Sequence, residues 1–346
     1  MDVTIRDVAR RAGVSIATVS RALNNSGAIR EDTRRAVVRA ARELGYWPNP
    51  AARSLHGKAT GGLGVLLPYV SGEFFAELLS GLDEGAQAGG RFILVSTSHR
   101  RSEEFQAAIR AMSKRVDGLV VMAPALDTLG VESVLSWEGP VTFINTSVDG
   151  VATDVLNFDN YGGAFALTRH LLDAGHRRIA LIKGAPGAWD AQERARGYRA
   201  ALAEAGAEAT PDLEFEGEYT QAAGYAVAPE ILAVDPRPTA ILAANDYCAA
   251  GVLSALSEAE IAVPDEMAVA GFDGVTSAQY MLPPLTTVHV PIRSIGYRAI
   301  QQLIARLEDR AGADPVQEVI PVDLVIREST RADVPHPTGG GSPAMD

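Results

Sequence analysis

Apolar residues recur at helical spacing at the start of the chain and predict three short helices. The first of these helices has its apolar positions on one face, at Ile5, Val8, Ala9 and Ala12. Thr4 can cap this helix, Gly13 can adopt the positive φ of a tight turn, and Ser15 can cap the second helix. A third amphipathic stretch spans residues 31–44 and stops at Gly45. Two short helices around a tight turn indicate a helix-turn-helix.

From residue 63 onward the pattern changes to short apolar runs that alternate with amphipathic stretches. The apolar runs predict strands at residues 63–67, 92–96, 118–122, 141–145, 178–182, 240–243 and 267–271. The amphipathic stretches predict helices at residues 75–88, 103–113, 161–174, 193–205, 222–233, 248–259 and 292–310. Continuous apolar runs are typical of parallel strands that are buried on both faces. We therefore expect an α/β fold with doubly wound parallel sheets.

Composition and charge refine this picture. The 346 residues suffice for two or three domains, and 47% hydrophobic with 21% charged residues is typical of a soluble globular protein. The formal net charge of −12 is divided unevenly: residues 1–60 hold 11 Lys and Arg against 5 Asp and Glu, and the remainder holds 20 against 38. A basic head on an acidic body is the distribution expected of a tethered DNA-binding domain.

Several function classes find no support in the sequence. Cys248 is the only cysteine, and the N-terminus lacks the apolar core of a secretory signal. No apolar run approaches the ~20 residues of a membrane span, so we expect a cytoplasmic protein without membrane contact. The chain has no P-loop, no metal-ligand spacing and no nucleophile elbow. We therefore expect no enzyme activity, no cofactor and no metal.

The second predicted helix carries the residues expected to read DNA. Ile16, Ala17 and Arg21 lie one turn apart and would face base edges in the major groove. The Arg21 guanidinium can donate two hydrogen bonds to guanine, a pairing worth about 1–3 kcal/mol of discrimination. Ile16 and Ala17 can offer apolar contact to thymine methyl groups, with core packing as the alternative for Ile16. Phosphate contacts are expected from the helix N-termini and from polar side chains, namely Thr4, Ser15, Thr18, Ser20, Asn24 and Asn25.

The run of residues 1–58 resembles the lactose-repressor (LacI/GalR) family. It has the helix-turn-helix, the third helix and the segment Pro-Asn-Pro-Ala-Ala-Arg-Ser-Leu in the order of that family. The resemblance implies that two hinge helices, each too short to persist alone in water, form on the operator. They would push paired Leu55 side chains into the minor groove at a central CpG step, with packing of Leu55 against its own domain as the alternative. The hinge residues expected at the DNA are Asn49, Ala52, Arg53 and Leu55.

The resemblance extends more weakly to about residue 330 and implies the bilobal fold of periplasmic (type I) sugar-binding proteins. In that fold the chain crosses between the lobes three times, here expected near residues 158–160, 287–291 and 318–321. The expected parts are a helix-turn-helix DNA-binding domain at 1–48, a hinge helix and linker at 49–61, and an effector-binding and dimerisation domain at 62–330. Its first lobe would hold residues 62–158 and 290–318, and its second lobe residues 159–287 and 319–330. Residues 331–346 are expected to be disordered and lack a leucine heptad, so a dimer is the simplest assembly.

A ligand site is expected where the strands end. Aromatic faces suit the C–H face of a sugar ring, and carboxylates and amides suit its hydroxyl groups. The candidate effector-binding residues are Phe74, Asn145, Phe158, Trp189, Asp190, Arg194, Asn245 and Asp273, and the resemblance implies that all but Trp189 line the effector cleft. Arg194 could instead be a structural ion-pair partner, Asp273 could organise only its own loop, and Asp246 is expected to cap a helix. Gln192 and Gly274 depart from the pattern of the sugar-binding members, which leaves the effector open.

Together these patterns predict a ligand-responsive repressor of sugar uptake or catabolism genes. It would bind a pseudopalindromic operator as a homodimer and be released by a sugar or sugar derivative. The alternatives are a nucleoside or purine co-repressor on the same fold, a solute-binding protein, or an enzyme. Residues 1–58 argue against the solute-binding protein, which would need a signal peptide in place of the helix-turn-helix.

Overall fold

The computed structural model divides the chain into two compact units, Met1–Thr60 and Gly61–Asp346. It describes residues 3–23, 29–46, 59–99, 101–125, 127–148, 152–207, 209–308 and 314–331. The predicted hinge at residues 49–58 and the tail from residue 332 lie outside these ranges, and so do Asn24 and Asn25.

Residues 3–23 and 29–46 of the N-terminal unit form three helices, α1 (Ile5–Ala12), α2 (Ile16–Leu23) and α3 (Glu31–Leu44). The Asp7 carboxylate accepts hydrogen bonds from the backbone N–H of Thr4 at 3.0 Å and from its hydroxyl at 2.7 Å. Gly13 ends α1 at a φ of 67°, and the Ser15 hydroxyl caps α2 by accepting from the Thr18 N–H at 3.1 Å. The start and turn signals in the sequence are therefore confirmed. The three helices pack around fully buried valines, Val8, Val19 and Val37.

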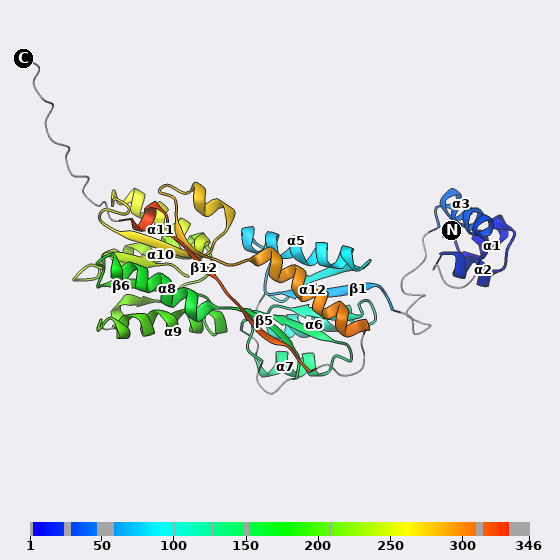
Figure 1. Ribbon diagram of the computed structural model, residues 1–346, viewed down its shortest axis with the longest axis horizontal. Helices are drawn as coiled ribbons and strands as arrows, with labels where there is room; N and C mark the ends of the chain where they lie inside the picture. The colour runs from blue at the N-terminus through cyan, green and yellow to red at the C-terminus, as the bar shows by residue number, and fades with distance from the viewer. Residues whose placement is uncertain are drawn as a thin grey trace, which may run out of the picture. The chain divides into compact units, whose positions relative to one another are not determined.

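The larger unit is built on two six-stranded sheets, each with helices on both faces (Figure 1). The first sheet has the order β11-β5-β4-β3-β1-β2, and all its neighbouring strands are parallel. Its strands are β1 (Gly62–Leu67), β2 (Phe92–Thr97), β3 (Gly118–Val121), β4 (Val141–Ile144), β5 (Asp154–Phe158) and β11 (Gln317–Ile320). Its helices are α5 (Gly72–Ala88), α6 (Ser102–Met112), α7 (Thr128–Leu135) and α12 (Ile292–Glu308). These elements are called the first lobe.

The second lobe is formed around the sheet β12-β10-β9-β8-β6-β7, in which only β12 runs antiparallel to its neighbour. Its strands are β6 (Ile179–Ile182), β7 (Glu214–Phe215), β8 (Ala240–Leu242), β9 (Ala268–Asp273), β10 (Thr286–His289) and β12 (Asp323–Val325). Its helices pack in two pairs, α8 (Asn160–Asp173) with α9 (Trp189–Glu204), and α10 (Gln221–Leu232) with α11 (Asp246–Glu258).

The chain passes between the two sheets three times. It leaves the first sheet after β5, returns after β10 to form α12, and leaves again between β11 and β12. Consequently neither lobe is a continuous stretch of sequence, and three neighbouring connecting segments join the lobes.

Alternating burial explains how the first sheet is covered on both faces. Val65 and Val120 belong to a core cluster with residues of α5 and α12, whereas Leu66 packs with Phe105 of α6 in a second cluster. Because successive side chains of a strand point to opposite faces, one apolar run supplies both cores. In this respect the expectation of strands buried on both faces is confirmed for β1 and β3.

The expectation of burial on both faces is wrong for β2, which lies at the edge of its sheet. Phe92 and Val95 of β2 are 47% and 38% exposed, although the apolar run had predicted burial on both faces. The reason is positional: an edge strand has a neighbour on one side only, and the sequence does not reveal which strand ends a sheet.

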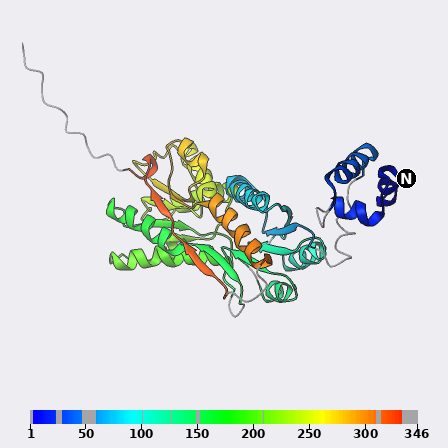
Figure 2. The same cartoon turned by 45° about the vertical axis from the view of Figure 1, so that its right-hand side comes forward.

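Helices α5 and α12 lie side by side in both views of the ribbon (Figures 1 and 2). Their backbones approach closely because glycines face the partner helix. A Cβ atom at Gly81 of α5 would collide with the carbonyl oxygen of Arg293, and one at Gly296 of α12 would lie 2.5 Å from the carbonyl oxygen of Leu78. The close pair positions the first turn of α5, which forms part of the site described next.

Candidate functional site

The expected DNA-reading residues lie on the outer side of α2. Ile16 is 46% exposed, and Ala17 and Arg21 are also exposed, while Val19 and Ala22 are buried. The alternative that Ile16 packs in the core is therefore wrong. The Arg21 Nε donates to the Ala17 carbonyl at 3.3 Å. Of the expected phosphate contacts, Thr4 and Ser15 are exposed and Thr18 and Ser20 are half-buried.

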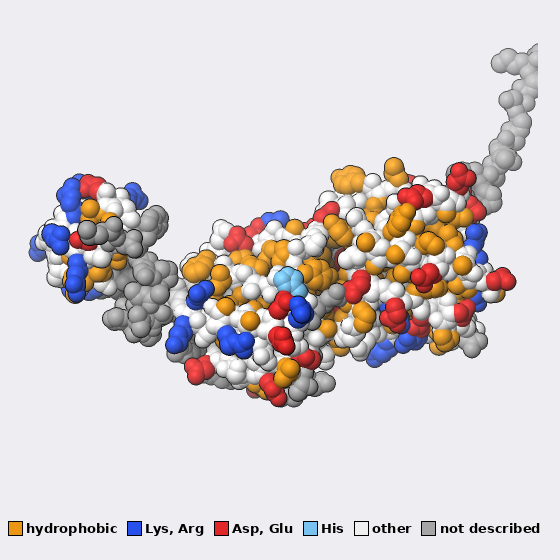
Figure 3. Space-filling model, turned by 180° about the vertical axis from the view of Figure 1, so that it is seen from behind, with side chains coloured by type: hydrophobic (Ala, Val, Ile, Leu, Met, Phe, Trp, Pro, Cys, Tyr) orange, Lys and Arg blue, Asp and Glu red, His pale blue; other side chains and the backbone are white. Residues whose placement is uncertain are grey.

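Basic side chains are prominent on this unit. Figure 3 shows Lys and Arg side chains over its visible face. Several are held by ion pairs within the unit, such as Arg11 with Glu43 at 2.5 Å. The hinge candidates Asn49, Ala52, Arg53 and Leu55, with Asn24 and Asn25, lie outside the described residues, so their part in DNA binding stays a prediction.

A cavity of about 510 Å³ opens between the two lobes. Seven of the eight candidate effector residues line it: Phe74, Asn145, Phe158, Asp190, Arg194, Asn245 and Asp273. They come from the first turn of α5, the ends of β4, β5 and β9, the first two turns of α9 and the N-cap of α11. The eighth, Trp189, does not line the cavity, and its backbone N–H donates to the Pro124 carbonyl at 2.8 Å.

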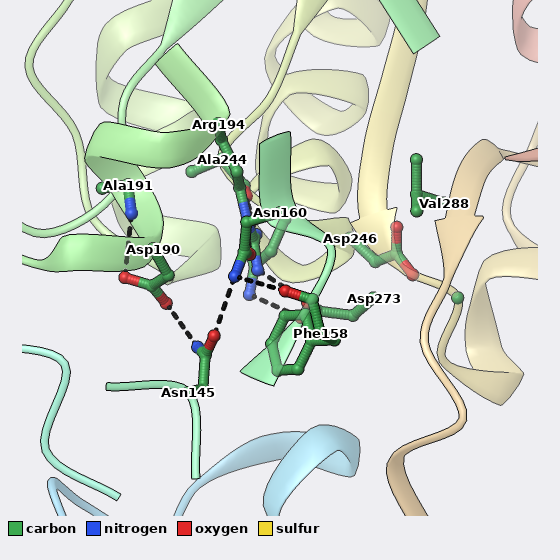
Figure 4. A network of polar contacts seen from close by, with 12 residues as sticks. Asn145, Phe158, Asn160, Asp190, Ala191, Arg194, Ala244, Asp246, Asp273 and Val288 are labelled. Carbon is green, nitrogen blue, oxygen red and sulfur yellow. Dashed lines mark hydrogen bonds and ion pairs between the residues drawn. The ribbon is translucent and has the colours of Figure 1, made fainter. Parts of the chain in front are cut away.

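The polar residues at the base of the cavity form one network (Figure 4). Asn145 donates through Nδ2 to Asp190 at 3.1 Å and accepts at Oδ1 from Asn160 at 2.8 Å. Asn145 belongs to the first lobe and Asp190 to the second, so this bond also joins the lobes. Asn145 holds a φ of 49°, a left-handed conformation that asparagine tolerates better than most residues.

Arg194 connects the two halves of the network. Its Nε donates to Asn160 at 2.9 Å, its Nη1 to the Ala244 carbonyl at 2.6 Å, and its Nη2 to Asp273 at 3.5 Å. The guanidinium carbon lies 3.8 Å from the ring centroid of Phe272. The side chain lines the cavity and also forms an ion pair with Asp273. The predicted place of Arg194 at the effector and its alternative role as an ion-pair partner are therefore compatible.

Asp273 is a buried carboxyl of the cavity wall with a shifted pKa. Burial raises its pKa to about 6, against the opposing effect of the Arg194 charge and a hydrogen bond from Asn245 at 3.3 Å. Its φ of 110° is unusual for a residue other than glycine. A buried carboxyl with a raised pKa and a strained backbone is a candidate for a functional position, and the alternative that Asp273 organises only its own loop stays open.

Asp246 was expected to cap a helix, and this is wrong. Asn245 is the N-cap of α11, because its Oδ1 accepts from the Cys248 N–H at 2.9 Å. Asp246 is fully buried and accepts from the Thr287 hydroxyl at 2.5 Å and from the Val275 N–H at 2.9 Å. Burial raises the pKa of Asp246 well above its ordinary value, and the nearby Asp273 charge raises it further. The carboxylate thus fixes the loop that follows β9.

Several lining residues were not found from the sequence, namely Tyr69, His99, Glu218, Tyr219 and Tyr247. Glu218 and Tyr219 follow β7, a two-residue strand without a recognisable pattern. Tyr69 lies two residues after the predicted strand at 63–67, and Tyr247 lies two residues after the candidate Asn245. Proximity to a strand end was therefore the available signal. Burial and the nearby Asp190 raise the pKa of Tyr219 well above its ordinary value.

Further contacts join the lobes above the cavity base. The Glu73 carboxylate at the start of α5 accepts from the Ser277 N–H of the second lobe at 2.9 Å. The ring of Tyr247 packs on the backbone of Gly72, where an added Cβ would lie 3.3 Å from the ring. Gly72 has a φ of 81°, so glycine suits both the turn and the approach of the ring.

Known proteins resemble both units. Residues 4–49 match "Bacterial regulatory proteins, lacI family", and residues 168–330 match "Periplasmic binding protein-like domain". The HTH-type transcriptional repressor PurR of Photobacterium profundum is 34% identical over 334 residues, which cover 95% of this chain and 98% of the relative. The chain belongs to the LacI family.

Solved structures of LacI-type regulators agree with this assignment. The lac repressor dimer bound to operator and an anti-inducer superposes with a TM-score of 0.85 at 29% identity, covering 96% of this chain and 100% of that one. The CelR–cellobiose complex gives a TM-score of 0.73 at 29% identity, covering 95% and 100%. The expected helix-turn-helix and bilobal α/β fold are confirmed.

The LacI-family relatives are transcriptional repressors and not enzymes, so this chain is a DNA-binding repressor. In the parts of the chain that the structure describes, no helix is both long and apolar enough to cross a membrane. The same parts contain no group of three or more His, Cys, Asp or Glu residues that could hold a metal ion.

Proposed function

We propose that this LacI-family repressor binds a pseudopalindromic operator as a homodimer and is released by a sugar in the cleft between its lobes. The composition of the cavity wall carries the proposal. Phe74 offers an aromatic face next to the buried ring of Phe158, while Asp190 and Asp273 offer carboxylate oxygens with lone pairs beyond those already used. This pairing of flat apolar faces with charged acceptors suits a polyhydroxylated ring.

Two features support the dimer. The edge strand β2 exposes Phe92 and Val95, and an uncovered apolar edge favours pairing with another chain. The lac repressor, similar in fold, is a dimer on its operator. A dimer would present two α2 helices to two half-sites, so that the symmetry of the operator mirrors that of the protein.

The hinge would couple the ligand to the DNA. We infer that residues 49–61 form the hinge and linker, and that Leu55 enters the minor groove at a central CpG step. A ligand that favours one arrangement of the lobes would bias hinge-helix formation by its differential affinity for the two states. The contacts Asn145–Asp190 and Glu73–Ser277 between the lobes are the elements that such a ligand would strengthen or break.

A purine or nucleoside co-repressor is the alternative effector. The likeness to repressors named PurR favours its inclusion in the test. A planar base could stack on Phe74 and hydrogen-bond to Asp273, so the wall of the cavity is compatible with it.

Operator binding with and without candidate effectors tests the proposal. Fluorescence anisotropy on DNA from the promoter of the protein's own operon would be measured with sugars, hypoxanthine and adenosine added separately. We expect a sugar to weaken binding. If the sugars have no effect and hypoxanthine or adenosine tightens operator binding, the effector is a purine or nucleoside co-repressor and not a sugar inducer.

A further inference from the structure

The charge of the cavity limits which ligands it can accept. Four carboxylates line it, from Glu73, Asp190, Glu218 and Asp273, against one guanidinium, that of Arg194. Among the described residues no lysine reaches the lining. The wall is therefore acidic, and any bound group meets a negative field.

The guanidinium of Arg194 is already engaged. It donates to Asn160, to the Ala244 carbonyl and to Asp273, and it is only 5% exposed. A phosphate or carboxylate in the cavity would thus lose its water and, among the described lining residues, face four carboxylates against one partly engaged guanidinium. An anionic ligand is disfavoured, whereas a neutral ligand with hydroxyl donors meets unused carboxylate lone pairs.

The volume of the cavity exceeds the volume of one sugar ring. If each CH₂O unit of a hexose is given the ~30 Å³ of a water molecule, one ring takes roughly 180 Å³ and two rings take roughly 360 Å³. The cavity measures about 510 Å³. One ring would fill about a third of it, and two rings about two thirds, so the cavity has room for a second ring.

The wall also differs between its inner and outer parts. The inner part consists of buried polar residues, each no more than 8% exposed, namely Asn145, Asp190, Arg194, Asn245 and Asp273. The outer part is half-buried or exposed and includes Tyr69, His99, Glu218 and Tyr247. The inner part can hydrogen-bond one ring from several sides, and the outer part offers aromatic faces with polar groups beside them.

The two outer tyrosines are held in place before any ligand arrives. Tyr69 contacts Phe75 edge to face, with ring centroids 4.7 Å apart. Tyr247 packs on the backbone of Gly72 across the cleft. A fixed aromatic face loses little conformational entropy when a ring stacks on it, so it can act as a specific subsite.

We propose that the cleft has two subsites and binds an uncharged saccharide of two rings, with the inner ring held by Asp190 and Asp273 and the outer ring stacked on Tyr247. This inference rests on the proposed sugar response. It adds that phosphorylated sugars are excluded, that single rings bind weakly, and that Tyr247 discriminates between one ring and two.

Calorimetric titration of the whole protein tests the ligand class. The probes are glucose, galactose, glucose 6-phosphate, maltose, cellobiose, lactose, hypoxanthine and adenosine. We expect the tightest ligand to be one of the three disaccharides, at least tenfold tighter than either hexose, with no binding of glucose 6-phosphate. A hexose or glucose 6-phosphate that binds best overturns the two-subsite inference but leaves the sugar-responsive repressor intact. Binding of hypoxanthine or adenosine alone, or of no probe, overturns the sugar response and the inference with it.

Tyr247 variants test the outer subsite. In Tyr247→Ala we expect disaccharide affinity to fall about tenfold, while hexose affinity stays within twofold, because only the outer ring loses its stacking partner. Tyr247→Phe retains the aromatic face and should restore disaccharide affinity. Tyr225→Ala, a half-exposed tyrosine of the same lobe outside the cavity, is the matched control. Equal losses for hexose and disaccharide in a folded Tyr247→Ala protein would overturn the outer subsite.

Discussion

The guanidinium of Arg21 lies on the exposed side of α2, while the same helix buries Val19 and Ala22 against α1 and α3. Its only hydrogen bond among the described residues is a long one, to the Ala17 carbonyl at 3.3 Å. Such a weak local bond can be exchanged for two bonds to a guanine edge at small cost.

We predict that Arg21→Ala weakens operator binding by about 1–3 kcal/mol and relaxes the base preference at one position of each half-site. Binding-site selection on the variant measures the effect. Arg35→Ala, which removes an exposed arginine of α3 paired with Glu31, is the control. Unchanged base frequencies in the Arg21 variant would make this residue a phosphate contact.

A second residue-scale prediction concerns Asp273, whose pKa of about 6 lies above its ordinary value because the carboxyl is buried. The charged groups facing it are Arg194, which favours the ionised form, and Asp190, which opposes it, while the charge of Asp273 in turn raises the pKa of the buried Asp246. A raised folded-state pKa means that the ionised carboxylate destabilises the free protein as the pH rises through 6. A ligand hydroxyl that donates to the carboxylate favours ionisation, so sugar affinity should fall as the pH drops below 6.

Titration calorimetry at pH 5 and pH 7.5 measures this dependence. We expect Asp273→Asn to bind the same sugar at least tenfold more weakly at pH 7.5 and to lose most of the pH dependence. The pH dependence that remains in the variant measures the contribution of all other groups. A full pH dependence in Asp273→Asn would assign it to another group.

Residues at strand ends could be found from the sequence because a parallel sheet brings the ends of its strands to one edge. Asn145, Phe158 and Asp273 follow this rule. The outer wall could not be found in the same way. Glu218 reaches the cavity from the loop after β7, a two-residue strand that no local pattern predicts.

At the scale of elements, the pair α5–α12 depends on small residues at its contact. We predict that Gly81→Ala lowers the free energy of unfolding by about 1–3 kcal/mol, because the new methyl group meets the Arg293 backbone and the helices must move apart. Urea denaturation measures this change in the free energy of unfolding. Ser80→Ala, at an exposed position of the same helix, should change stability by less than about 0.5 kcal/mol. Equal stabilities for the two variants would mean that the helices separate without cost.

The long helices and central strands could be predicted because their own apolar spacing specifies them. Residues 31–44 form α3 as expected, and the predicted helix at 248–259 corresponds to α11 at Asp246–Glu258. Strands β5, β7, β10, β11 and β12 were missed, and so was helix α7. The missed strands are two to five residues long, so their conformation depends on the neighbouring strand in the sheet. Strand β11, for example, pairs with β5 across more than 150 residues of sequence.

For the whole molecule, the bond between Glu73 and the Ser277 N–H is the contact that best tests motion of the lobes. Ser277→Pro removes the donor, while Ser277→Ala keeps it. We predict that the proline variant binds its sugar about two- to tenfold more weakly, because a ligand between the lobes needs them together and one bridging bond is lost. Ser277→Ala should match the original protein. Equal affinities for the two variants would show that this bond does not contribute to closure.

The three passages between the lobes also order events during synthesis. Residues 61–158 emerge from the ribosome first, but their sheet still lacks β11 and the cover provided by α12. The intervening 133 residues need on the order of ten seconds of translation. Throughout that interval the side of α5 that packs on α12 lacks its partner helix. We expect a chain truncated after residue 290 to be cut by protease within α5, where the full-length protein resists.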